Sequence, residues 1–168
     1  MQTRISYNLN TIQNRIAAAA AHSGRNPAEV TLVAVTKTVG VDEIRVLYDL
    51  GVRDFGENRL ESALPKIGLL PKDICWHFIA PVQSRKARDV AAWFRIVEAV
   101  DRVKIAEALQ KRCEELDRTL DIMVEVNVTG EESKHGFAAE ELSDAIMQIR
   151  SLDRLNLKGL MTETMRTF

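Results

Sequence analysis

Apolar residues along this chain alternate between two spacings, one typical of amphipathic helices and one typical of buried strands. Over 5–21 they recur every three or four positions, which predicts a helix that the segment 22–24 ends. The block 31–36 is apolar at its centre without a break, which predicts a strand covered on both faces. A second helix is predicted over 41–50, and Gly51 is placed to end it.

The alternation continues to the end of the chain. Further strands are predicted at 52–55, 75–79, 95–100, 121–128 and 157–162, and further helices at 57–67, 84–93, 102–116 and 138–149. Six strands that each lead into a helix indicate βαβ units and a parallel sheet. The sheet could be open and doubly wound, or part of a (β/α)8 barrel.

Two observations favour the barrel. The units recur about every 25 residues, which is near the density of a complete barrel of about 250 residues. No Gly-rich phosphate turn follows the first strand, where a dinucleotide-binding sheet would have one. The predicted fold is therefore α/β, a TIM-barrel type (β/α)8 fold that is incomplete. Residues 1–168 form one barrel domain with about six units, which lacks the last units and carries two open edges.

Composition excludes several classes of protein. Hydrophobic residues make up 46 % of the 168 residues and charged residues 28 %, with a net charge of −1, which is typical of a globular chain and not of a disordered one. This balance gives no general attraction for nucleic acid. No apolar run is long enough to span a membrane, and the N-terminus lacks the apolar core of a secretory signal. We expect a cytoplasmic protein that binds neither nucleic acid nor a membrane.

The two cysteines, Cys75 and Cys113, lie far apart in the sequence. We expect both to be reduced thiols. Neither has a second Cys or His at the spacing of a chelating motif, so no metal site is expected.

Polar residues at the carboxyl ends of predicted strands are the candidates for chemistry, because parallel α/β folds place their active sites there. Lys37 directly follows the first apolar strand. A lysine that is partly desolvated at such a strand end becomes nucleophilic and can form a Schiff base with a carbonyl compound. The alternative is a lysine whose ammonium group simply reaches solvent at the rim.

Position alone favours structural roles for His77 and Asp101 and leaves the roles of Asn58 and Asn127 open. His77 lies between two aromatic residues, as a hydrogen-bonded core histidine would. Asn58 and Asn127 could be site amides or turn residues, and position does not decide between these roles. Asp101 is placed to cap the helix that follows it.

Six segments, in this order and spacing, resemble the pyridoxal phosphate homeostasis protein family. They are Leu32–Thr38, Asp54–Asn58, Trp76–Ile79 with Gln83, Ser84 and Lys86, Val100–Arg102, Val126–Val128 with 130–134, and Lys158–Thr162. The resemblance covers nearly the whole chain. It implies a single-domain fold-type III barrel like the N-terminal domain of alanine racemase, which binds pyridoxal 5′-phosphate (PLP) and helps to control its level.

The resemblance also implies roles for individual residues. Lys37 would hold the cofactor aldehyde as an internal aldimine, Asn58 and His77 would lie near the cofactor ring, and Met161 would lie in the same mouth of the barrel. PLP is the expected cofactor and partner, and PLP-dependent apoenzymes are candidate recipients. No robust catalysis is expected, so the implied protein is a PLP carrier and not an enzyme, and a monomer or a weak homo-oligomer.

The sequence also departs from the family pattern. Ala80 replaces a usual Gly, and Arg85 replaces a usual Asn. After Thr162 the family continues into further units with a Ser-Met-Gly-Met-Ser type phosphate turn and an Arg-x-Gly segment, and this sequence contains neither. We therefore expect Lys37 to anchor the aldehyde without the usual phosphate site.

Three other functions stay open at this point. The first is a fold-type III PLP enzyme of the amino-acid racemase kind. The second is an aldolase-type lyase that uses Lys37 without a cofactor. The third is a truncated fragment with impaired PLP binding.

Overall fold

A single parallel sheet organises the computed structural model, which describes residues 2–131 and 135–163. The described strands are β1 (Ala34–Val35), β2 (Asp54–Glu57), β3 (Cys75–Phe78), β4 (Ile96–Val100), β5 (Leu120–Glu125) and β6 (Leu155–Met161). They lie side by side in chain order, and each pairs in parallel with the next. Residues 132–134, which end one of the family-like segments, lie outside the described residues, as do residues 1 and 164–168.

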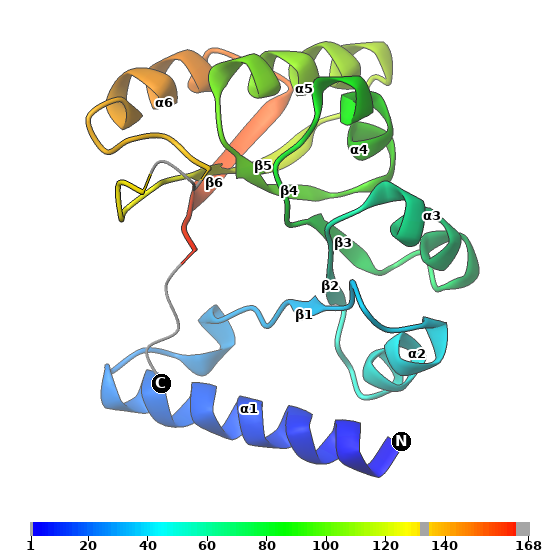
Figure 1. Ribbon diagram of the computed structural model, residues 1–168. Helices are drawn as coiled ribbons and strands as arrows, with labels where there is room; N and C mark the ends of the chain where they lie inside the picture. The colour runs from blue at the N-terminus through cyan, green and yellow to red at the C-terminus, as the bar shows by residue number, and fades with distance from the viewer. Residues whose placement is uncertain (1, 132–134, 164–168) are drawn as a thin grey trace.

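Helices connect the strands and cover one face of the sheet. The described helices are α1 (Gln2–His22), η1 (Pro27–Glu29), α2 (Val41–Asp49), α3 (Leu60–Leu69), η2 (Ser84–Lys86), α4 (Ala87–Trp93), α5 (Val103–Glu115) and α6 (Leu142–Arg150). Figure 1 shows α2 to α6 on the convex side of the curved sheet. The hydrophobic core lies between these two layers, and its largest fully buried residues include Phe55, Phe94, Ile105, Leu109 and Ile122.

The strand order confirms the barrel type of α/β fold. A doubly wound sheet reverses its strand order at a switch point, whereas barrel strands follow one another in sequence. The observed order β1-β2-β3-β4-β5-β6 has no reversal. Within the described sheet, β1 and β6 are the two edges. The assignment of residues 1–168 to one incomplete barrel domain stays a prediction.

The prediction for the first strand was wrong in extent and in burial. Only Ala34–Val35 pairs as a strand. Val35 is 53 % exposed, although we expected the strand to be covered on both faces. Alternate residues along this stretch differ, because Thr36 is buried beneath α3 while Val35 lies on the opposite face. Among the described strands β1 pairs only with β2, so its other edge and its concave face are open.

Several predicted boundaries shift in the structure. The second strand begins two residues late, at Asp54, and runs on through Glu57, so helix α3 begins at Leu60 and not at residue 57. The fifth strand ends at Glu125, and helix α6 begins at residue 142 instead of 138. Glu57 stays in the strand because its carboxylate is buried in a hydrogen-bonded cluster under α3, described below.

Two helix-end predictions have opposite outcomes. Gly51 follows the end of α2 with φ +95°, a conformation that glycine adopts without steric cost, which confirms its role in ending the helix. Asp101 does not cap α5. The N-cap is Arg102, whose side chain makes no capping bond, and Asp101 is instead buried and accepts a hydrogen bond from the Arg102 guanidinium at 2.9 Å.

No helix in the described part of the chain combines the length and the apolar character needed to cross a membrane.

Candidate functional site

Lys37 lies at the carboxyl end of β1, where the sequence placed it. It is exposed and begins a turn that the Val39 N–H closes by donating to the Thr36 carbonyl at 3.1 Å. Lys37 makes no hydrogen bond or ion pair with any other described residue. Its amine is therefore unengaged within that part of the molecule and accessible from solvent. The expected partial desolvation is absent there, and the exposure agrees with the alternative of a lysine that reaches solvent.

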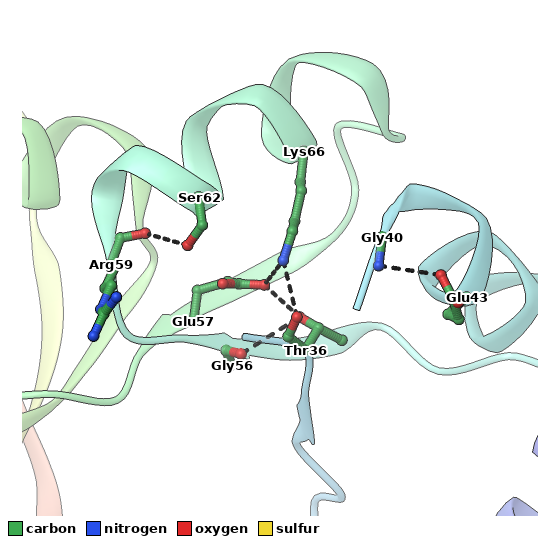
Figure 2. Close-up of polar contacts among 8 residues, drawn as sticks. All are labelled: Thr36, Gly40, Glu43, Gly56, Glu57, Arg59, Ser62 and Lys66. Carbon is green, nitrogen blue, oxygen red and sulfur yellow. Dashed lines mark hydrogen bonds and ion pairs between the residues drawn. The ribbon is translucent and has the colours of Figure 1, made fainter. Parts of the chain in front are cut away.

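The backbone next to Lys37 is held by a buried polar cluster of Thr36, Glu57 and Lys66 (Figure 2). The Lys66 ammonium group, from α3, donates to the Thr36 carbonyl at 2.9 Å and to Glu57 Oε1 at 2.8 Å. The Thr36 hydroxyl donates to the same carboxylate oxygen at 2.7 Å. The side chain of Glu57 is 0 % exposed and that of Lys66 is 11 % exposed.

This cluster fixes the short edge strand to the rest of the fold. β1 spans only two residues, and its next residue, Thr36, donates its N–H to the Gly56 carbonyl at 2.9 Å. The bond from Lys66 then ties the Thr36 carbonyl to helix α3. The backbone of Thr36 is thus held by hydrogen bonds to β2 and to α3, which fixes the backbone position from which Lys37 extends.

Lys37 differs from the other lysines near this end of the sheet. Lys66 is buried and bonded, as described above, and Lys86 forms an ion pair with Glu61. An ammonium group that is held by a carboxylate is a poor nucleophile until it loses that partner and a proton. Of these three described lysines, Lys37 alone has a free side chain.

Asn58 directly follows β2 and is partly exposed. It borders a hollow of about 350 Å³ whose other lining residues are Arg59, Glu61, Phe78, Pro81, Gln83 and Lys86. The three other predicted site residues, Lys37, His77 and Met161, are not among them. The structure thus places Asn58 at the same end of the sheet as Lys37 but does not bring the four residues together in this hollow.

His77 lies within β3, in a network of polar side chains. Its Nδ1 is 2.6 Å from Glu98 Oε1, and its Nε2 is 3.0 Å from Asp54 Oδ1 and 3.5 Å from Cys75 Sγ. Burial lowers the pKa of His77, but the hydrogen bonds to Cys75, Glu98 and Asp54 outweigh this effect and raise it to about 10. The expectation of a core histidine is thus confirmed for burial and hydrogen bonding, but the ring is charged at neutral pH and its partners are side chains.

The strand register gives the depth of His77 relative to Lys37 and Asn58. Val35 pairs with Gly56, and Gly56 pairs with His77. Lys37 and Asn58 follow Val35 and Gly56 by two residues each, which corresponds to about 6.6 Å along a strand. His77 therefore lies one layer of side chains deeper than the strand-end residues, with both ring nitrogens engaged by protein groups.

Met161 and Asn127 lie at the far side of the sheet. Met161 closes β6, is partly buried, and accepts a hydrogen bond from the Val126 N–H at 2.8 Å. It shares the carboxyl end with Lys37 but lies on the opposite edge strand. The Asn127 side chain donates to the Glu131 carbonyl and accepts from the Gly130 N–H, at 2.8 and 3.0 Å. Asn127 is therefore a turn residue, one of the two roles that the sequence left open for it.

Two buried carboxylates, Asp101 and Glu125, lie at the ends of β4 and β5. Asp101 Oδ1 and Glu125 Oε2 are buried without a hydrogen-bond partner among the described residues. His135 Nδ1 is 3.6 Å from the other oxygen of Asp101. Burial, followed by repulsion from Asp101, raises the pKa of Glu125 above its ordinary value of 4.5. The two carboxylates repel each other at the carboxyl end of the sheet, where a functional site is expected.

Glu125→Gln should therefore stabilise the protein. Between pH 4.5 and the raised pKa the folded state holds a proton that the unfolded state releases, so the stability of the unmodified chain falls as pH rises through this window. The amide carries no charge, and we expect a gain of about 1 kcal/mol at neutral pH that disappears in acid. Urea unfolding at several pH values measures it, with Glu115→Gln as the control, since Arg112 lowers the pKa of Glu115. A loss of stability at neutral pH would contradict the account.

The two departures from the family pattern cause no visible disruption. Ala80 is partly buried and packs against the core. Arg85 is exposed and donates to Gln83 Oε1 at 3.1 Å, as a solvated residue at a helix start would.

Sequence reasoning missed the partners of its candidate residues. Glu57 was one of the polar residues found after the second strand, but neither it nor Lys66 was predicted to contact Thr36. Nothing in the apolar spacing of the predicted helix 57–67 marks a buried lysine. Asp54 and Glu98 become visible as neighbours of His77 only through the strand register. Cys75 could have been found, because residues two apart on a strand share a face.

Comparison with known proteins agrees with this architecture. The family model of the alanine racemase N-terminal domain matches residues 7–165. A pyridoxal phosphate homeostasis protein from Pseudomonas aeruginosa is 42 % identical over 158 residues, which cover 94 % of this chain and 69 % of the relative. The structure of PipY from Synechococcus elongatus PCC7942 with PLP bound superposes with a TM-score of 0.76 at 31 % identity and covers 89 % of this chain and 70 % of that one.

An alanine racemase from Clostridium difficile 630 shares the fold alone. It superposes with a TM-score of 0.74 at 15 % identity, over 96 % of this chain and 40 % of the racemase. The identity to the homeostasis proteins is more than twice as high and extends over nearly the whole chain. This protein therefore belongs to the pyridoxal phosphate homeostasis protein family, whose fold is that of the alanine racemase N-terminal domain.

Proposed function

We propose that this protein binds PLP through Lys37 and serves PLP homeostasis, with no robust catalysis of its own. The observation that carries the proposal is the state of Lys37. Its amine is accessible, has no bonded partner among the described residues, and lies at the carboxyl end of a strand whose position is fixed by Thr36, Glu57 and Lys66. The PLP-bound structure of PipY and the names of the curated relatives support PLP as the ligand.

The residues at the carboxyl end of the sheet fit an aldehyde cofactor. Lys37 would hold the cofactor, because its amine could form a C=N bond with an aldehyde and release one water. When bound, PLP supplies that aldehyde on an electron-withdrawing ring. Asn58 would offer amide hydrogen bonds from the neighbouring strand end, and Met161 would offer an apolar surface at the same end of the sheet, from the opposite edge strand β6. His77 forms part of the floor one layer below, because both of its nitrogens are already engaged.

A carrier fits this arrangement better than an enzyme. A racemase needs a proton donor and acceptor opposite the lysine, in addition to the lysine itself. The relatives that share 36 to 42 % identity bear the name of homeostasis proteins. We assign PLP-dependent apoenzymes as the recipients of the cofactor, and the expected cytoplasmic location is consistent with that role. Incubation with L-alanine and PLP should give no D-alanine, and turnover would favour the racemase.

The preference for the phosphate group is the first test of the binding mode. We expect PLP and pyridoxal to bind residues 1–168 with affinities within about tenfold of each other, a difference of about 1.4 kcal/mol, because these residues do not include the phosphate turn of the family pattern. Absorbance titration of the purified chain with each compound measures the two affinities. A preference of more than about a hundredfold for PLP would show a phosphate site among the residues of this chain. A folded chain that binds neither compound would contradict the proposed function itself.

A further inference from the structure

The concave face of the sheet carries a second cluster of chemistry-bearing side chains, separate from Lys37. Asp54 opens β2, and Cys75 and His77 lie two residues apart on β3, so both face the same side as Asp54. One ligand-type atom from each of the three residues lies within 4.8 Å of the other two. The His77 side chain is only 3 % exposed, while those of Asp54 and Cys75 are partly open to solvent.

We propose that Asp54, Cys75 and His77 form a binding site for a transition-metal ion of the zinc type. The donor set is one carboxylate oxygen, one sulfur and one imidazole nitrogen, which suits Zn²⁺ or Co²⁺ and not the oxygen-seeking Mg²⁺ or Ca²⁺. The site does not include Lys37. It shares His77 with the floor of the proposed PLP site, but the proposal does not require PLP to bind.

Two of the three distances between donor atoms are close to those around a tetrahedral metal, and the third, between Cys75 Sγ and the Asp54 carboxylate, is no more than 4.8 Å. Bond lengths of about 2.3 Å to sulfur and 2.0–2.1 Å to nitrogen or oxygen place S and N about 3.6 Å apart, and N and O about 3.3 Å apart. The observed distances are 3.5 Å from Cys75 Sγ to His77 Nε2 and 3.0 Å from His77 Nε2 to Asp54 Oδ1. An ion can thus enter between these atoms with small shifts of the side chains.

Glu98 completes the arrangement from the neighbouring strand. Its carboxylate holds His77 Nδ1 at 2.6 Å, which directs Nε2 toward Cys75 and Asp54. A carboxylate on the far nitrogen of a metal-binding histidine fixes the ring and increases its basicity. The three protein donors leave one position of a tetrahedron to solvent, the pattern of exchangeable sites and not of closed structural ones.

Charge and proton balance agree with binding. The Cys75 thiol and His77 Nε2 each release one proton to solvent when the ion binds, while the Nδ1 proton stays in the bond to Glu98. Two positive charges arrive and two protons leave, so the net charge of the cluster is unchanged. No oxidant or reductant takes part.

Cobalt binding tests the site directly, because a Co²⁺–thiolate bond gives a charge-transfer absorption band. We expect the reduced wild-type chain to bind one Co²⁺ with this band and with the intense visible bands of tetrahedral Co²⁺, and Zn²⁺ to displace it. Cys75→Ala should abolish the charge-transfer band, whereas Cys113→Ala, which removes the buried thiol of α5, should retain it. Asp54→Asn should weaken Co²⁺ binding at least about tenfold, the least that losing one ligand or its support typically costs.

Several results would overturn the proposal. They are a wild-type Co²⁺ spectrum without a thiolate band, a band that persists in Cys75→Ala, and a band that is lost in Cys113→Ala while that variant stays folded by circular dichroism. Should Cys75→Ala fail to fold, the wild-type spectrum and the partly exposed Asp54→Asn variant still decide. PLP is omitted throughout, so failure of the PLP proposal does not affect the outcome.

Discussion

Replacing Lys66 by methionine is expected to destabilise the protein by about 3–5 kcal/mol. The substitution removes the ammonium group that neutralises Glu57, whose side chain is fully buried and has a second oxygen without a partner among the described residues. A buried charge that loses its partner typically costs this much, and far more than an exposed pair. The Thr36 carbonyl loses its contact with α3 at the same time.

Urea unfolding at neutral pH measures this effect against a matched pair. Lys86→Met breaks the ion pair with Glu61, in which the side chains of Lys86 and Glu61 are 27 % and 68 % exposed, and should cost far less than Lys66→Met because solvent screens an exposed pair. Adding Glu57→Gln to Lys66→Met should restore part of the lost stability, since no buried charge then remains. Equal costs for the two lysine substitutions would show that the Glu57–Lys66 pair does not stabilise β1 as described.

Replacing Lys37 by alanine is expected to abolish covalent attachment of PLP and leave the fold intact. The side chain is exposed and has no bonded partner among the described residues, so its loss should change the free energy of unfolding by less than about 0.5 kcal/mol. The attachment depends on its amine alone, so borohydride reduction in the presence of PLP should no longer add cofactor mass to the intact protein.

Lys72→Ala is the control for this loss. Lys72 is an exposed lysine just before β3, at the amino end of the sheet and away from Lys37. Its variant should be labelled as the wild type is. Labelling of Lys37→Ala to the wild-type level, one cofactor per chain, would mean that another lysine is the anchor.

The sequence was informative where a local pattern determines structure. The change between apolar runs and helical spacing located each of the described strands, and Gly51 marked the end of α2 because its positive φ is a local requirement. The predicted position of Lys37 after β1 was also correct, since the carboxyl end of a strand can be located from the end of its apolar run. Boundaries failed where tertiary contacts decide them, as with Glu57, which stays in β2 because its partners Thr36 and Lys66 come from other elements.

The contacts around the site residues could be identified only from the structure. The network of His77 joins residues from three strands, and only the parallel register brings Asp54 and Glu98 to the same ring. Asp101 precedes a predicted helix, as an N-cap residue would, but its carboxylate is buried near His135 and accepts a hydrogen bond from Arg102. Propensity describes such a residue in isolation, whereas its burial depends on chain segments that pack against it from a distance.

Peptide mapping of the chain after reduction with borohydride in the presence of PLP shows directly whether Lys37 is the residue that binds the cofactor. We expect a yellow chain before reduction, one cofactor per chain afterwards, and a label confined to the peptide that contains Lys37. A label on Lys66 or Lys86, a label spread over many surface lysines, or a folded chain without label would contradict this expectation.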